Sequence, residues 1–384
     1  MKRLMLASAL STVTLFGCAA EETDPGTPPP DDIDQTLLAE YRKALPSMGQ
    51  LGAKAPEGSA ASILAVGDPA LYPTSSYDIA TGINGAVTGI VQLLDDVTSI
   101  QPTIFNSETN EFFWGPFPNE DGIGYVAAYI REGRPDADFQ FEYALLRGID
   151  NDVAKLTPVI WGGATPDAEN EDHGAGVTLW DFEANRAFEE EHNPDFANLV
   201  LDRGRFVALY AAGQDENDPE AEAVYVLATF RNFVSIDNPT AEPANLDYFY
   251  GHYEKEIKVD FLDWEASFDV TEPADGLAEN VGVRMAFLNE GTGRAEADAA
   301  GGSLAEGQEA SVVECWNAAI EQSYISFDVL EGGETIASAE EGNFADCGLF
   351  TASLDDLGVP SLDDVDPGLR AILDEVARNG VIAE

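Results

Sequence analysis

A two-residue alternation of apolar and polar side chains dominates the chain between residues 111 and 350. It is clearest in 139–145, 224–231 and 281–287. Because neighbouring side chains of a strand point to opposite faces, this alternation predicts half-buried β-strands. About twelve such segments, joined by short acidic loops with no helical pattern between them, predict antiparallel hairpins. We therefore expect a mainly β fold, in which 111–350 forms one large antiparallel meander curled into a barrel or half-barrel.

Helical spacing of apolar residues flanks the strand region on both sides. Apolar residues recur every three or four positions in 34–48, 77–99 and 355–380, which predicts amphipathic helices. We expect a helical N-terminal segment, 35–110, that packs on the sheet, and a C-terminal helical tail, 351–384. Two or three helices would then pack against the meander.

The longest predicted helix carries a stripe of glycine at Gly82, Gly85 and Gly89. Glycine costs a helix about 1 kcal/mol per position, so such a stripe suggests close approach of another backbone. A helix lying in or across a barrel and a helix packed simply on a sheet both fit this pattern. In the first case the barrel would enclose an apolar ligand. The candidate ligand-binding residues are then Phe139, Phe141 and Tyr143 of a strand and Ile83 and Val87 of the helix.

The first residues have the pattern of an export signal. Lys2 and Arg3 are followed by a short apolar run that ends at Phe16, and the run is shorter than the ~20 residues that a membrane-spanning helix needs. It ends in Leu15-Phe16-Gly17-Cys18, which resembles the lipobox of bacterial lipoproteins.

The lipobox resemblance implies cleavage of a signal peptide, residues 1–17, and acylation of Cys18. Ala19 and Ala20 follow the cysteine, and in lipoproteins of this class the absence of an Asp there favours the outer membrane, facing the periplasm or the cell surface. Residues 18–34 form an acidic, Pro-rich stalk. An ordinary secretory signal with an incidental cysteine is the alternative.

Two cysteines remain once Cys18 is assigned to the anchor. Cys315 and Cys347 are an even remainder in an exported chain, which predicts a disulfide bond. Neither is spaced with a histidine as zinc ligands are, so the sequence predicts no cysteine metal site.

Charge narrows the range of partners. The formal net charge is −52, and a surface this negative repels nucleic-acid backbones, so we expect no nucleic-acid partner. The histidines, His173, His192 and His252, are scattered. The densest acidic group, at 215–218, does not match a Ca²⁺-binding loop, so we expect no metal and no cofactor, although specific Ca²⁺ binding remains an alternative.

An enzymatic alternative rests on one stretch rich in acids and aromatic residues. Glycoside hydrolysis needs two carboxylates that face each other across a cleft, and Glu254 or Glu265 would supply one of them. His252 would serve as a base near Asp247. The sequence contains no hydrolase nucleophile motif, phosphate-binding loop or zinc-protease motif.

A second resemblance concerns the body of the chain. Gly291-Thr292-Gly293-Arg294, then Gly301-Gly302 and Glu314-Cys315-Trp316, are similar to a block in uncharacterised exported bacterial lipoproteins, and that resemblance implies no activity. In physical terms, we expect Trp316 to pack beside the disulfide and Arg294 to pair with a carboxylate.

These observations favour a lipid-anchored, outer-membrane-associated binding or interaction module for an apolar small molecule or a protein partner. A glycan- or lipid-acting hydrolase and a structural or adhesive surface protein are the alternatives. The membrane itself is a partner through Cys18.

Overall fold

A computed structural model of the chain describes most residues beyond the stalk. The described residues are 33–54, 66–119, 122–134, 137–168, 170, 173–215, 218–236, 239–240, 243–254, 257–268 and 276–380. The predicted signal peptide, Cys18 and nearly all of the stalk lie outside them, as do two residues of the 215–218 group.

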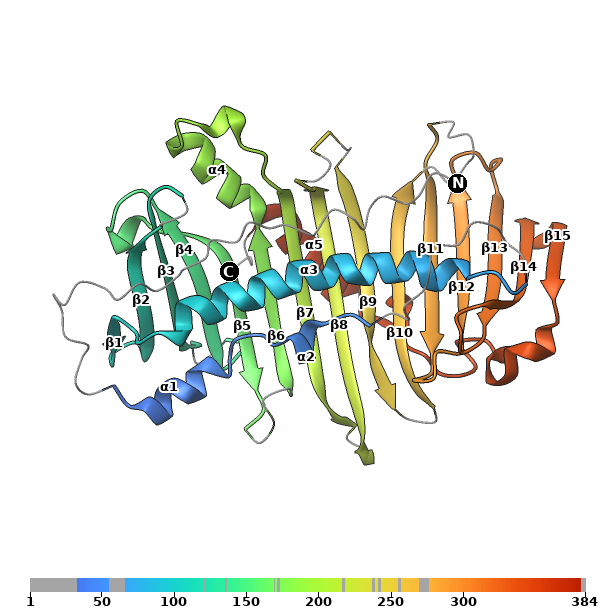
Figure 1. Cartoon of the computed structure of the whole chain (residues 1–384), viewed down its shortest axis with the longest axis horizontal. Helices are drawn as coiled ribbons and strands as arrows, with labels where there is room; N and C mark the ends of the chain where they lie inside the picture. Colours follow the sequence, from blue (N-terminus) through green and yellow to red (C-terminus); the bar gives the residue numbers. More distant parts are fainter. Residues whose placement is uncertain are drawn as a thin grey trace.

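Fifteen strands form one antiparallel sheet in which each strand pairs with its neighbours in sequence (Figure 1). The prediction of a mainly β antiparallel meander is confirmed. Within the described part of the chain β1 and β15 are the two ends of the strand order, so the sheet is open, as in a half-barrel. The strands are β1 (Ile104–Asn106), β2 (Glu111–Pro118), β3 (Tyr125–Glu132), β4 (Phe141–Gly148), β5 (Thr157–Pro166), β6 (Gly174–Asp181), β7 (Arg203–Asp215), β8 (Asp218–Val234), β9 (Ala244–Glu254), β10 (Lys258–Phe268), β11 (Glu279–Phe287), β12 (Gly293–Gly301), β13 (Gln308–Trp316), β14 (Gln322–Glu331) and β15 (Glu334–Gly342).

Helices lie on both faces of this sheet. Among the described residues three helices precede the sheet in sequence, one interrupts it between β6 and β7, and one follows it, with short 3₁₀ turns between. In the described residues no helix is long and apolar enough to cross a membrane. The helices are α1 (Gln35–Arg42), α2 (Met48–Leu51), α3 (Leu71–Ser99), α4 (Phe182–His192) and α5 (Pro367–Asn379), and the 3₁₀ turns are η2 (Val153–Lys155), η3 (Phe196–Asn198), η4 (Phe344–Thr351) and η5 (Leu362–Asp364).

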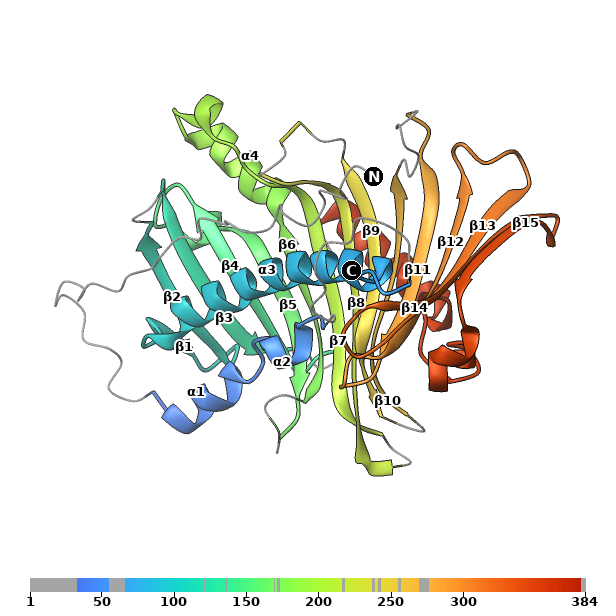
Figure 2. The ribbon, with the colours of Figure 1, turned by 45° about the vertical axis from the view of Figure 1, so that its right-hand side comes forward.

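Helix α3 runs across the strands from one end of the sheet towards the other (Figure 1). Three hydrogen bonds mark its course. Glu314 of β13 meets its first residues, Trp264 of β10 donates to Ser76, and Trp114 of β2 donates to the carbonyl of Ile100. The helix has 29 residues, or ~43 Å, whereas the strand spacings from β2 to β13 sum to ~53 Å along the sheet. The sheet therefore curves around the helix (Figure 2).

Two apolar layers cover the two faces of the sheet. The concave layer joins α1, α2 and α3 to inward-facing strand residues such as Phe112, Tyr250 and Met285. The convex layer joins β6–β11, β13 and β14 to the C-terminal segment, including Leu373 and Val376 of α5. The predicted packing of helices on the sheet is thereby confirmed, with a helical cover on each face.

Several elements differ from the sequence prediction. The first strand begins at Ile104, β12 and β15 are additional strands, and α4 lies between two strands where no helix was expected. The prediction that no helix interrupts the strands was wrong, because Asp181 ends β6 and at the same time caps α4 by accepting a hydrogen bond from the Ala184 amide.

Candidate functional site

The candidate ligand-binding residues were expected to share one interior, and four of the five do. Phe141, Tyr143, Ile83 and Val87 are buried in the concave layer. Phe139 was placed there wrongly, because β4 begins only at Phe141. The alternation therefore does not extend back to Phe139, which packs on the convex layer.

The concave face is filled by protein from β2 to β13. Ile83, Val87 and Ile90 of α3 are at most 2% exposed. Asn84 of the same helix exchanges two hydrogen bonds with the backbone of Ala53, one in each direction. This contact ties α3 to the segment that follows α2, through the side chain of Asn84. Helix α3 thus occupies the space in which an enclosed ligand would have to lie.

Both ends of α3 are held by charged side chains from other elements. At its start the carboxylate of Glu314, 0% exposed, accepts hydrogen bonds from the amides of Leu71 at 2.8 Å and Tyr72 at 2.9 Å. At its end the guanidinium of Arg42 donates to the carbonyl of Ile100 at 3.0 Å. Amides at a helix start and carbonyls at its end lack intrahelical partners. Arg42, and Glu314 when it is ionised, also match the helix dipole in sign.

Two buried carboxyl groups bind their protons unusually tightly. Burial raises the pKa of Glu314 to about 7, and burial also raises the pKa of Asp263 to about 7, although the amide of Leu362 donates to it. Both groups are ionised in the unfolded chain at pH values where they keep a proton in the folded chain.

We expect the free energy of unfolding to fall as the pH rises from about 4.5 to 7. In this window the folded chain binds more protons than the unfolded chain, so raising the pH favours unfolding. Denaturant titrations at several pH values measure this slope. The Asp263→Asn variant should have a flatter profile over the same range, and an unchanged slope would contradict the assignment.

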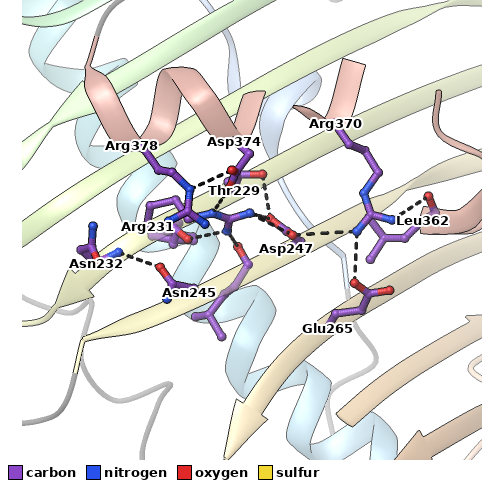
Figure 3. A network of polar contacts seen from close by, with 12 residues as sticks. Thr229, Arg231, Asn232, Asn245, Asp247, Glu265, Leu362, Arg370, Asp374 and Arg378 are labelled. Atoms are coloured by element: carbon purple, nitrogen blue, oxygen red, sulfur yellow. Dashed lines mark hydrogen bonds and ion pairs between the residues drawn. The ribbon is translucent and has the colours of Figure 1, made fainter. Parts of the chain in front are cut away.

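A network of charged residues fastens α5 to the convex face of the sheet (Figure 3). Arg231 of β8, 8% exposed, lies between Asp247 of β9, at 2.9 Å, and Asp374 of α5, at 2.5 Å. Nearby, Arg370 of α5 contacts Glu265 of β10 at 3.1 Å. The network joins three adjacent strands to one helix. Its role is therefore to hold α5 on the sheet.

Replacing Arg231 with Met should destabilise the chain by about 1–2 kcal/mol, because Asp247 and Asp374 lose a buried cationic partner but keep part of their hydration and their contacts with Arg370 and Arg378. Amide exchange should accelerate in α5 more than in the strands. Arg134→Met, on an exposed loop residue, is the control and should leave exchange unchanged. Uniform acceleration throughout the sheet would speak against a local fastening role.

The disulfide joins β13 to the segment that covers the convex face. The Cα atoms of Cys315 and Cys347 are 5.5 Å apart and the bond is present, as predicted. Arg294 pairs with Glu296 at 2.7 Å, so its pairing with a carboxylate is confirmed. The placement of Trp316 beside the disulfide was wrong. Trp316 lies in the concave layer and Cys315 in the convex layer, because adjacent strand residues face opposite ways.

The residues proposed for hydrolysis are held in ion pairs. His252 contacts Asp260 and Glu254 at 2.9 and 3.0 Å, whereas Asp247, its expected partner, belongs to the Arg231 network. These contacts raise the pKa of His252, with the hydrogen bond to Asp260 as the largest cause. A histidine between two carboxylates is stabilised in its charged form, which disfavours a role as a base at neutral pH.

The last two strands differ from the rest of the sheet in exposure. Every residue of β15 is exposed, and Phe327 of β14 is 42% exposed. Phe327 lies opposite Val312, which packs against the concave layer, and opposite Ala339. Directly opposed residues share a face, so Phe327 continues the concave apolar face beyond the start of α3.

We name this area the terminal surface. It is the concave side of β14 and β15 and consists of Ile325, Phe327, Val329, Ala337 and Ala339, with the acidic Glu341 opposite Ile325 at its end. Its two strands carry five acids, Asp328, Glu331, Glu334, Glu340 and Glu341, and no cation. The sequence contains no Lys, Arg or His between Arg294 and Arg370. Figure 2 shows these strands at the end of the sheet, past the first turn of α3.

Sequence reasoning did not single out the terminal surface. The strand β15 carries only one large apolar residue, Ile336, so it shows no alternation of large apolar side chains. The turn Gly332-Gly333 was the available signal, because both glycines adopt positive φ and a Gly-Gly pair after a strand predicts a hairpin with a second strand.

Comparisons with protein-family models, with curated proteins and with solved structures find no match to this chain.

Proposed function

We propose that the protein is a lipid-anchored interaction module of the outer membrane that binds a protein partner at the terminal surface. The observation that carries this proposal is the contrast between the two parts of the concave face. From β2 to β13 it is filled by α3, whereas over β14 and β15 it is apolar and open to solvent, with Phe327 42% exposed.

A protein fits this surface better than a small apolar molecule does. Small ligands bind in concave pockets that bury most of their area, and Ile83, Val87, Phe141 and Tyr143 are already buried against one another. An open apolar area with a polar rim is typical of protein interfaces. The acids around the terminal surface supply such a rim.

The anchor places this module at a membrane while keeping it free to bind. An acylated Cys18 with two or more chains holds a protein stably on a bilayer. The Pro-rich residues 21–34 extend up to roughly 40 Å when fully stretched. The anchor is tested by Cys18→Ala, which should move the protein from the membrane fraction to the soluble fraction, and a variant that stays with membranes would contradict it.

Site-specific crosslinking in intact envelopes tests the binding surface. A photoreactive phenylalanine analogue replaces Phe327 in the full chain, and in a second protein it replaces Val153, which is 50% exposed in η2 near the other end of the sheet. We expect one discrete protein adduct from position 327 and none from 153. An excess of wild-type protein, which keeps Phe327, should compete for the partner and reduce the amount of adduct.

Two outcomes would overturn this proposal. One is the absence of an adduct at position 327 although the protein is anchored and folded. The other is the same set of adducts from both positions, which would indicate random collision.

A further inference from the structure

We propose that β15 binds an extended segment of the partner, alternately basic and apolar, as an added strand of the sheet. This inference rests on the proposed function and specifies the partner's chemistry. It concerns the open edge of β15, whereas the terminal surface concerns one face of the same strands.

The backbone of β15 offers an open docking edge, with one register shift at Ile336. The strand has nine residues, all exposed, and it is the last in the order. In an edge strand every second residue turns its N–H and C=O groups away from the sheet, where they can pair with another strand. The opposite edge is β1, with three residues, which is too short to offer a comparable row of hydrogen bonds.

The distribution of charge along β15 favours an added strand that carries basic residues. The central residues 335–339 are uncharged, while Glu334 precedes them and Glu340 and Glu341 follow them. Long edges are commonly protected from aggregation by charge. Here the charged ends disfavour a second copy of this chain, whose net charge is −52, and leave the centre free to pair with a basic segment.

The two faces of the edge differ in chemistry, and this difference predicts the pattern of the added strand. On the concave side Ala337 and Ala339 lie beside Val329 and Phe327. On the convex side Ser338 and Glu340 lie beside Asp328 and Ser326. Since successive side chains of a strand alternate between faces, apolar residues would lie on the concave side and Lys or Arg on the convex side. Such recognition combines backbone hydrogen bonds with alternate side-chain contacts.

The inference is tested with three synthetic peptides and the purified full chain. The first is a nine-residue peptide in which Val and Lys alternate, the second replaces each Lys with Glu, and the third replaces alternate residues of the first with Pro, which removes backbone donors. Fluorescence anisotropy of a labelled peptide measures affinity. We expect the Val-Lys peptide to bind at least about tenfold more tightly than either other peptide, and added salt to weaken it.

Variants of the chain locate the bound peptide. Glu334→Lys with Glu340→Lys should weaken binding on the order of tenfold, whereas the matched pair Glu108→Lys with Asp138→Lys, exposed near the other end of the sheet, should bind as the wild type does. Amide exchange in β15 should slow when the Val-Lys peptide is added.

The inference is overturned by equal binding of the Val-Lys and Val-Glu peptides, by equal binding of the Pro peptide, or by unchanged exchange in β15. Sedimentation that shows a stable dimer of the free chain through β15 would overturn it as well. An adduct at Phe327 together with failure of the peptide experiment would retain the proposed function and reject the added strand.

Discussion

Replacing Glu314 with Ala should lower the free energy of unfolding by about 2–4 kcal/mol. The substitution removes the acceptor of two partly buried amides at the start of α3, those of Leu71 and Tyr72, and an unsatisfied donor shielded from water costs about 1–3 kcal/mol. The change also leaves a small void at a position with 0% exposure. Chemical denaturation followed by circular dichroism measures the loss.

Two controls separate helix capping from a general effect of mutation on β13. Glu314→Gln keeps one oxygen that can accept from an amide, so it should cost less than Glu314→Ala. Glu309→Ala, at an exposed position of the same strand, should change the free energy of unfolding by less than about 0.5 kcal/mol. Equal losses for all three variants would show that capping of α3 is not the cause.

Loss of the Cys315–Cys347 bridge should lower stability by about 3–4 kcal/mol. The bridge closes a loop with a sequence separation of 32 residues, and the entropy of the unfolded chain rises when a loop of this size is opened. In the Cys315→Ala, Cys347→Ala double variant, amide exchange in η4 should accelerate first, because the bridge ties this segment to β13.

A reducing agent provides the matching control for the bridge. It should destabilise the wild type to the level of the double variant and leave the double variant unaffected. Equal stability of the reduced and oxidised wild type would contradict the structural role of the bridge.

Strands with large apolar residues could be predicted from sequence, and strands without them could not. Alternation of large side chains identified β4, β8 and β11. The inward side of β12 carries alanine at 295, 297 and 299, which gives little contrast with polar neighbours. In β15 every residue is exposed, so burial imposes no pattern there.

The arrangement of layers could be predicted only in part. The helical spacing of 77–99 correctly indicated a helix packed on the sheet, and the even cysteine pair correctly indicated a disulfide. The prediction of the face on which a residue lies depended on the predicted start of its strand. A two-residue error at the start of β4 placed Phe139 in the wrong layer, and the C-terminal cover is held by distant pairs such as Arg231 and Asp374, which leave no local signal.

The candidate site depended on information that periodicity does not contain. Phe327 belongs to an ordinary alternating strand. It stands out because it is exposed, since α3 starts at β13 and does not cover β14. The extent of a helix across a sheet is a tertiary property. The absence of cations between Arg294 and Arg370 was visible in the sequence. It could be related to a binding surface only once β15 was known to be an edge strand.

Amide hydrogen exchange of α3 in the full chain, with and without a fatty acid, tests most directly whether the concave face is a packed core. We expect the amides from Ile79 to Val97 to exchange as slowly as those of β6–β10, through global unfolding, and the fatty acid to leave their exchange unchanged. Fast exchange in α3 alone, slowed by the fatty acid, would show that α3 moves to admit a ligand and would contradict the account.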